Sequence, residues 1–136
     1  MKGSLISLDA TEDKVSPITK GYVFLSYVRQ DQDFVDNLKK FLRDREYAYW
    51  DYRESDRDYQ TALYIELEKK IENASAFFSI LSDEWRDTEW TAKEYIYAKE
   101  ANIPIFVIQA KPLRRPVSLL LNEQTRIVMT SNVQFG

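Results

Sequence analysis

The sequence predicts an α/β domain with a three-layer, flavodoxin-like fold, in which a five-stranded parallel sheet is flanked by helices. Short apolar runs alternate along the chain with longer stretches whose apolar residues recur at helical spacing. The first apolar run, Tyr22–Val28, is almost continuous and rich in β-forming residues, which is typical of a central parallel strand buried on both faces. The runs follow one another closely, so parallel strands with right-handed helical crossovers are expected.

The domain is expected to span residues 21–136, after a polar and flexible N-terminal arm at residues 1–20. A chain of 136 residues is long enough for one domain with a sizeable core. Strands are expected at Tyr22–Val28, Tyr47–Asp51, Ala76–Leu81, Ile103–Gln109 and Arg126–Thr130. A helix that would cover the sheet after the fifth strand has no counterpart before Gly136, so we expect this last helix to be missing or to lie further on.

The first helix is expected to begin at Asp31 or Asp33, because short oxygen-bearing side chains favour the N-cap position, and to end near Arg45. Its apolar stripe is expected to consist of Phe34, Val35, Leu38, Phe41 and Leu42. Its solvent-facing side is expected to carry Lys39, Lys40, Arg43 and Asp44. The second strand is short and aromatic, and a charged loop at residues 52–58 follows it.

The second helix is expected from about Tyr59 to Ala74, with Leu63, Leu67 and Ile71 in the core. The third is expected at Asp87–Ala101, with Asp87 or Thr88 as its N-cap. Pro104 stands at the start of the fourth strand, where a missing backbone N–H is tolerated. A loop at residues 111–116 and a short helix at residues 117–121 lead to the fifth strand.

Composition excludes several classes of function. The net charge is −3 and no basic cluster is present, so no nucleic-acid partner is expected. No apolar run approaches the length of a membrane span, and the N-terminus lacks a signal peptide, so we expect no membrane contact and a cytoplasmic location. Without Cys or His, thiol nucleophiles, Cys/His zinc sites and histidine acid–base chemistry are excluded, and no metal site is expected. With only three glycines, a glycine-rich phosphate loop is also excluded.

A ligand is expected at the carboxyl ends of strands one and three, where the strand order of such sheets reverses. The loops that meet there are residues 27–33 and 82–87. Each of the three tryptophans has a glutamate four residues later, so this spacing alone identifies no site. The pair Trp90–Glu94 is the one that falls within a helix beside the expected crevice, where residues four apart share a face.

Three segments, in order and with matching gaps, resemble the boxes of the TIR (Toll/interleukin-1 receptor/resistance) domain, most closely its bacterial members with NAD-cleaving activity. They are a strand ending in Ser-aromatic before a charged helix (VFLSYVRQDQDFVDNLKKFLRD), Tyr-Trp-Asp before a charged loop, and LSDEWRDTEWTAKEYIYA. The resemblance covers about Gly21 to Thr130. The charged loop departs from the family pattern because it contains neither Gly nor Pro.

The resemblance implies that Glu94 is the catalytic carboxylate and that NAD is the substrate, with no cofactor. It implies that Trp90 shapes the pocket, that Tyr27 and Arg29 contact the nucleotide, and that Asp51 and Asp56 line the cleft. The alternatives to these functional roles are structural: a solvated Glu94, an ion pair of Arg29 with Asp31 or Asp33, and a strand-end cap at Asp51. A lone carboxylate suits the chemistry, because cleavage of an N-glycosidic bond develops positive charge on the ribose.

The function implied by the resemblance is that of an NAD+ nucleosidase or cyclase. It gives nicotinamide and ADP-ribose or a cyclic ADP-ribose variant, which serves as a signal in bacterial antiphage defence. The implied partners are other TIR domains, through self-association into oligomers, and a product-sensing effector protein. The alternative is a non-catalytic signalling adaptor or host-receptor mimic that acts through TIR–TIR assembly. A glutamate in register favours the enzyme.

Overall fold

The computed structural model describes residues 21–51, 63–121, 123–124 and 126–128. Its centre is a parallel sheet of five strands in the order β2-β1-β3-β4-β5. The strands are β1 (Val23–Ser26), β2 (Tyr49–Trp50), β3 (Ala76–Leu81), β4 (Ile105–Gln109) and β5 (Arg126–Val128). The predicted flavodoxin-like sheet is thereby confirmed.

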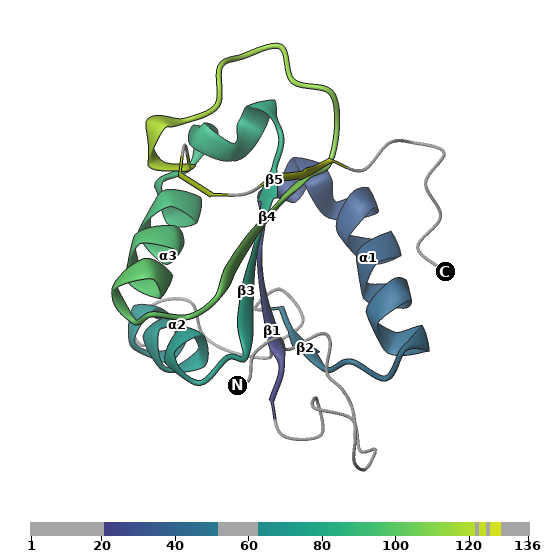
Figure 1. Ribbon diagram of the computed structural model, residues 1–136, viewed down its shortest axis with the longest axis vertical. Coiled ribbons are helices and arrows are strands. Elements are labelled where there is room, and N and C mark those ends of the chain that lie inside the picture. The colour runs from purple at the N-terminus through teal and green to yellow at the C-terminus, as the bar shows by residue number, and fades with distance from the viewer. Residues whose placement is uncertain (1–20, 52–62, 122, 125, 129–136) are drawn as a thin grey trace.

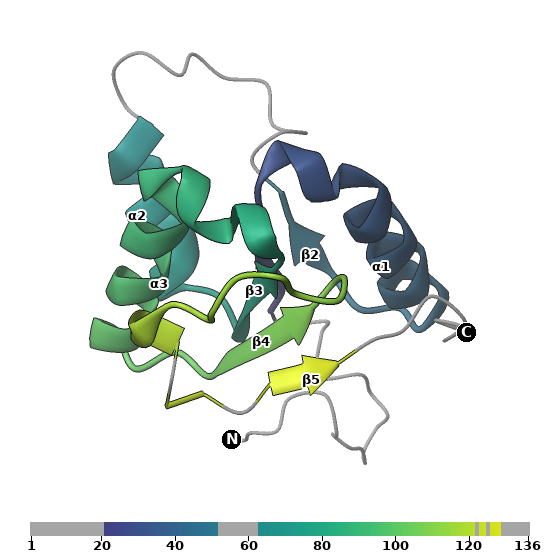
Figure 2. The same cartoon turned by 90° about the horizontal axis from the view of Figure 1, so that it is seen from above.

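Helices cover both faces of the sheet, so the molecule has three layers (Figures 1 and 2). One face is covered by α1 (Gln32–Asp44), and the other by α2 (Leu63–Glu72) and α3 (Glu89–Glu100). Alternate residues of β1 serve the two faces, since side chains of a strand point to opposite sides in turn. Val23 and Leu25 pack in the cluster with α1, whereas Phe24 packs in the cluster with α2 and α3.

The observed elements are close to those expected, with differences at their ends. Strand β3 has the predicted bounds, and β1, β2 and β4 are shorter than predicted. The predicted end of the fifth strand, at residues 129–130, lies outside the described residues. Within the described segments, three short 3-10 helices lie at chain turns, namely η3 (Arg29–Asp31), η5 (Asp83–Asp87) and η6 (Leu119–Leu121). The third helix therefore starts at Glu89 rather than Asp87, because residues 83–87 form η5 and Thr88 occupies the N-cap. Residues 59–62 of the second predicted helix lie outside the described residues, as does the predicted arm.

The prediction that Lys39 faces solvent is wrong. The residue is only 5% exposed, and its Nζ lies 2.5 Å from Asp51 Oδ2 and 5.5 Å from the centre of the Tyr49 ring. The helical position explains the burial, because Lys39 lies one turn after Val35 and thus near the apolar stripe of α1. The carboxylate at the end of β2 makes this position suitable for a cation.

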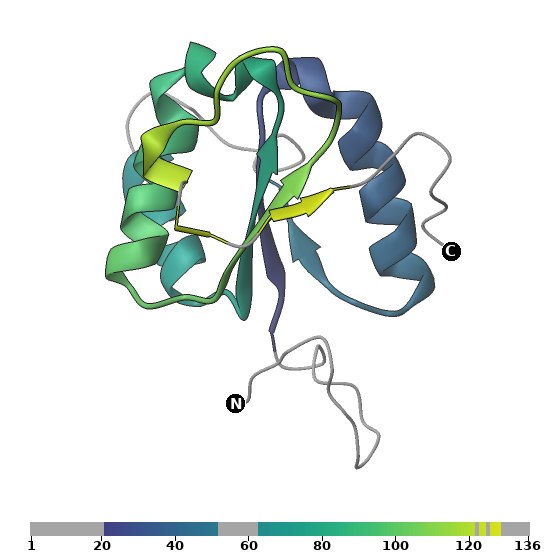
Figure 3. The ribbon, with the colours of Figure 1, turned by 45° about the horizontal axis from the view of Figure 1, so that its top comes forward.

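The carboxyl ends of β1 and β3 meet at the point where the strand order reverses. Figure 3 shows that the chain after β4 arches over the same edge of the sheet, close to η5. The fold thus brings the loops after β1, β3 and β4 together at the predicted crevice. None of the helices in the described segments is long and apolar enough to cross a membrane.

Candidate functional site

Glu94 is a buried carboxylate on α3. It is 4% exposed, and the Ser26 hydroxyl at the end of β1 donates a hydrogen bond of 2.7 Å to its Oε1. Ser26 is fully buried and lies on the strand position that faces α2 and α3. Burial of a carboxylate is costly, so a buried glutamate at a cleft is unusual for an ordinary helix surface. The solvated-helix interpretation of Glu94 is therefore wrong.

Two clefts meet at Glu94 and Trp90. The first has a volume of about 250 Å³ and a mainly polar lining, made up of Tyr27, Val28, Arg29, Gln30, Asp87, Thr88, Trp90, Thr91 and Glu94. The second has a volume of about 290 Å³, lies between α2 and α3, and is lined mainly by apolar and aromatic residues, namely Tyr64, Leu67, Glu68, Ile71, Trp90, Lys93, Glu94 and Tyr97. Glu94 thus lies where a ligand in either cleft could approach its side chain.

Trp90 is 40% exposed and lines both clefts, so its indole is a wall of the site rather than a core residue. Lys93 places its Nζ 5.4 Å from the centre of the Trp90 ring and 3.3 Å from Glu89 Oε1. An aromatic face that accepts a cation also suits a planar or positively charged ring. The predicted placement of Trp90 beside Glu94 agrees with this geometry.

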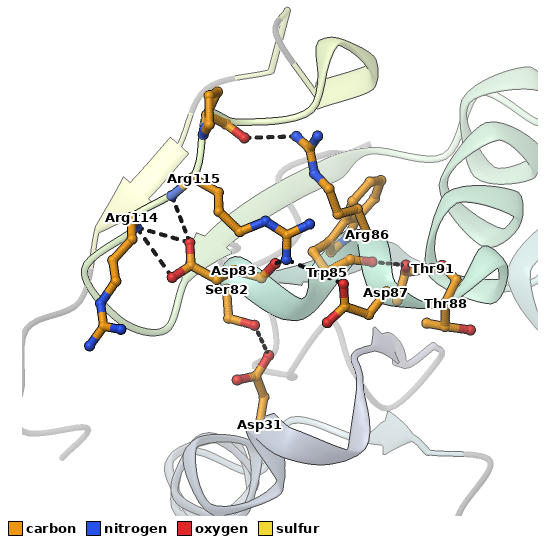
Figure 4. Close-up of polar contacts among 11 residues, drawn as sticks. Asp31, Ser82, Asp83, Trp85, Arg86, Asp87, Thr88, Thr91, Arg114 and Arg115 are labelled. Atoms are coloured by element: carbon orange, nitrogen blue, oxygen red, sulfur yellow. Dashed lines mark hydrogen bonds and ion pairs between the residues drawn. The ribbon is translucent and has the colours of Figure 1, made fainter.

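Hydrogen bonds fix the start of α3 against η5. The Thr88 hydroxyl accepts from the Trp90 backbone N–H at 3.2 Å and caps the helix. Figure 4 shows Thr91 beside η5, where its hydroxyl donates to the carbonyl of Trp85 at 2.5 Å. The Trp85 indole N–H in turn donates to Ser79 Oγ at 3.0 Å. These contacts fix Trp85 of η5 against strand β3.

Tyr27 lines the first cleft from the opposite side, and its hydroxyl donates to Asp51 Oδ2 at 2.6 Å. Asp51 is buried, also pairs with Lys39, and is not among the residues that line the cleft. The structure thus places Asp51 behind Tyr27, where it orients a lining residue. Asp56, predicted to line the cleft, lies outside the described residues.

Arg29 is exposed and provides the one cationic side chain among the described residues that line the first cleft. Guanidinium groups bind phosphates in bidentate fashion, so this position suits an anionic ligand. Asp31, a candidate partner in the sequence, is engaged elsewhere. Its Oδ2 accepts from the Ser82 hydroxyl at 2.6 Å, and its Oδ1 lies 3.4 Å from Lys111 Nζ.

Burial raises the pKa of the Asp31 carboxyl above its ordinary value, although the hydrogen bond from Ser82 and the charge of Lys111 oppose this effect. Asp31 occupies the N-cap position of α1, yet its side chain makes no cap hydrogen bond there. Its carboxylate instead joins the loops after β1, β3 and β4, and Figure 4 shows its contact with Ser82. It is a structural residue of the crevice edge.

Ser26 was not among the residues predicted for the site, and Lys39, which pairs with Asp51 behind Tyr27, was predicted to face solvent. A hydroxyl in an otherwise apolar strand, next to the expected crevice, was the available signal for Ser26. For Lys39 the signal was its position one turn after Val35. Among the described residues, no group of three or more Asp, Glu, His or Cys side chains could hold a metal ion. The chemistry that the described side chains can supply is that of a fixed carboxylate beside an aromatic wall and a cation.

Comparisons with known proteins give a consistent family. The TIR domain family model matches residues 23–132. The TIR domain of the Toll-related receptor TRR-2 from Hydra magnipapillata is 19% identical, with a TM-score of 0.68 over 78% of this chain and 82% of that chain. A metazoan TIR-STING receptor from C. gigas, solved in complex with 2',3'-cGAMP, is 14% identical, with a TM-score of 0.62 over 82% of this chain and 36% of that chain.

A third solved structure is the CMP N-glycosidase BcmB from Clostridium botulinum, which is 16% identical. Its TM-score is 0.56, over 82% of this chain and 90% of that chain. At these identities the likeness is one of fold. Among proteins with curated functions, none matches the sequence.

Proposed function

The chain belongs to the TIR domain family, and from this premise we propose that it cleaves the nicotinamide–ribose bond of NAD+, with Glu94 as the catalytic carboxylate. The observation that carries the proposal is the burial of Glu94 at the meeting point of two clefts, held by Ser26. Arg29 on the polar cleft suits the diphosphate, and the aromatic lining of the second cleft suits a planar base.

The reaction needs little more than charge stabilisation. NAD+ and water give nicotinamide, ADP-ribose and a proton. The electron pair of the C–N bond moves onto the pyridinium nitrogen, which neutralises the ring, and the ribose carbon becomes cationic. A fixed carboxylate lowers the energy of this oxocarbenium-like state. If a nucleophilic atom of the ADP-ribose part of NAD+ attacks the ribose carbon in place of water, the product is a cyclic ADP-ribose variant.

No general acid is required, because cationic nicotinamide leaves as a neutral molecule. The absence of histidine from the sequence therefore agrees with the proposed reaction. We expect the product to act as a signal, with bacterial antiphage defence as the setting and a product-sensing effector as the downstream partner. We also expect TIR–TIR self-association, so activity should rise with protein concentration.

Incubation of concentrated protein with NAD+, followed by chromatography of the nucleotides, tests the proposal. The wild type should produce nicotinamide together with ADP-ribose or a cyclic variant, and Glu94→Gln should stop the reaction. Glu100→Gln is the matched control, because it removes an exposed glutamate from the same helix and should leave the rate unchanged. The product also shows whether water or an internal nucleophile attacks.

Intact NAD+ with the wild type, even after forced oligomerisation, would overturn the proposed activity and favour the signalling-adaptor function. Cytidine monophosphate belongs in the same assay, because one protein of this fold is named as a CMP N-glycosidase. Release of cytosine without release of nicotinamide would keep the reaction class and replace the substrate.

A further inference from the structure

An acidic side chain on the wall of the polar cleft conflicts with an anionic ligand. Among the described residues that line this cleft, three are charged, namely the carboxylates Asp87 and Glu94 and the cation Arg29. A diphosphate placed there experiences repulsion from any carboxylate that is not neutralised, since solvent-exposed charges interact over roughly a Debye length, about 8 Å at physiological salt. Glu94 has a role in the proposed reaction, whereas Asp87 has none.

The Arg115 guanidinium pairs with the Asp87 carboxylate from outside the polar cleft. Its Nη1 donates to Asp87 Oδ1 at 3.2 Å and to the Asp83 carbonyl at 2.7 Å. Arg115 does not itself line the polar cleft. Arg115 lies on the loop that follows β4, and Figure 4 shows its guanidinium directed toward the Asp87 carboxylate of η5. Residues about thirty positions apart in sequence therefore set the charge of one cleft wall.

The loop that carries Arg115 is itself fixed to η5. The Asp83 carboxylate accepts from the backbone N–H of Arg114 at 2.9 Å and of Arg115 at 3.0 Å. The Arg86 guanidinium donates to the Pro116 carbonyl at 2.7 Å. The hydrogen bonds from the backbone of Arg114 and Arg115 lower the pKa of the Asp83 carboxyl, so it stays ionised and keeps its hold on the loop. The position of the Arg115 side chain thus follows from fixed backbone contacts.

We propose that Arg115 is a positioning and specificity residue that pairs with Asp87 so that the polar cleft accepts phosphate groups. The inference rests on the proposed function, because it assigns the phosphates of a nucleotide to this cleft. Its ligand class is a nucleotide that bears phosphates, as distinct from a nucleoside.

Arg114 provides a matched control. It is adjacent in the chain, carries the same charge and binds Asp83 through its backbone N–H. Its side chain points away from Asp87 in Figure 4. Arg114→Met and Arg115→Met therefore remove one positive charge each from the same loop, and the substitution at Arg115 is the one that removes the partner of Asp87.

The test compares KM for NAD+ with KM for nicotinamide riboside, which has the same scissile bond and no phosphate. At an ionic strength of about 0.01 M, Arg115→Met should raise KM for NAD+ by about threefold to tenfold, and the increase should shrink at about 1 M. The value of kcat, the KM for the riboside and both constants of Arg114→Met should stay close to wild type. Arg115→Met combined with Asp87→Asn should restore KM, because no unpaired carboxylate remains.

An equal loss with the riboside, an equal loss in Arg114→Met, or failure of Asp87→Asn to restore KM would overturn the inference. If Arg115→Met does not fold, Arg115→Lys keeps the charge and should keep a near-wild-type KM, and a large increase would contradict the proposal. If the wild type does not cleave NAD+, calorimetry with ADP-ribose separates the two proposals. If Arg115→Met then binds ADP-ribose more weakly than the wild type, the role of Arg115 is supported although the NAD+-cleaving activity is not. If the wild type does not bind ADP-ribose, both proposals are overturned.

Discussion

Ser26 and Tyr27 are neighbours in the chain, and each donates a hydrogen bond to a buried carboxylate on a different face of the sheet. Ser26 binds Glu94 on the side of α2 and α3, and Tyr27 binds Asp51 on the side of α1. Asp51 also pairs with Lys39 and lines no described cleft, whereas Glu94 lines two. A buried carboxylate paired with a cation belongs to the fold, because loss of either partner leaves a buried charge unpaired. A buried carboxylate that borders open clefts is available to a ligand.

The largest expected effect on stability comes from the α1 side. Lys39→Met or Asp51→Asn should each lower the free energy of unfolding by about 3–5 kcal/mol, because each leaves one buried charge without its ion-pair partner. The combined variant should lose less than the sum of the two, since neither charge remains. Urea unfolding of the four proteins measures this coupling. If the free-energy changes of the two single variants simply add in the combined variant, Lys39 and Asp51 do not act as a pair.

On the α3 side, Ser26→Ala should lower kcat by about fivefold with little change in KM, because a hydrogen bond worth about 1 kcal/mol no longer orients Glu94. Ser79→Ala is the control. Ser79 is also fully buried, pairs with Ser26 in register on the neighbouring strand, and contacts the Trp85 indole rather than Glu94. Steady-state kinetics gives kcat for both variants. An equal fall in kcat would show that Ser26 acts only through packing.

The smallest expected effect concerns pH. Burial raises the pKa of Asp31, so the folded protein binds its proton more tightly than the unfolded chain, and stability from this group falls as pH rises through the interval from the ordinary aspartate pKa to the raised one. Backbone hydrogen bonds lower the pKa of Asp83, so its contribution is present above the ordinary pKa and is lost as pH falls below it. Asp31→Asn and Asp83→Asn should therefore change the pH dependence of stability in opposite directions, which the urea midpoint of unfolding measured at several pH values checks.

The sheet was predictable because its evidence is local. The continuous apolar runs at Ala76–Leu81 and around Val23–Ser26 are typical of strands in a parallel sheet covered on both faces, and their order along the chain indicates the crossovers. The helix cap was predictable to Asp87 or Thr88 for the same reason, since it depends on two residues of the same turn, and the structure has Thr88 there.

Partners far apart in sequence were not predictable. The burial of Lys39 depends on Asp51, and the orientation of Glu94 depends on Ser26, which is 68 residues away. A helical pattern reports only which face is apolar, so it assigned Lys39 to solvent. The contact of Arg115 with Asp87 likewise requires the loop after β4 to arch over η5, which no spacing in the sequence indicates.

We expect Glu94 to serve the reaction rather than the stability of the fold. The most direct test of this expectation measures NAD+ cleavage and urea unfolding on the same preparation of Glu94→Gln. The amide retains the shape of the side chain and can accept from Ser26, so the free energy of unfolding should stay within about 1 kcal/mol of wild type while cleavage is lost. A variant that unfolds at much lower urea and still cleaves NAD+ would contradict the catalytic role of Glu94.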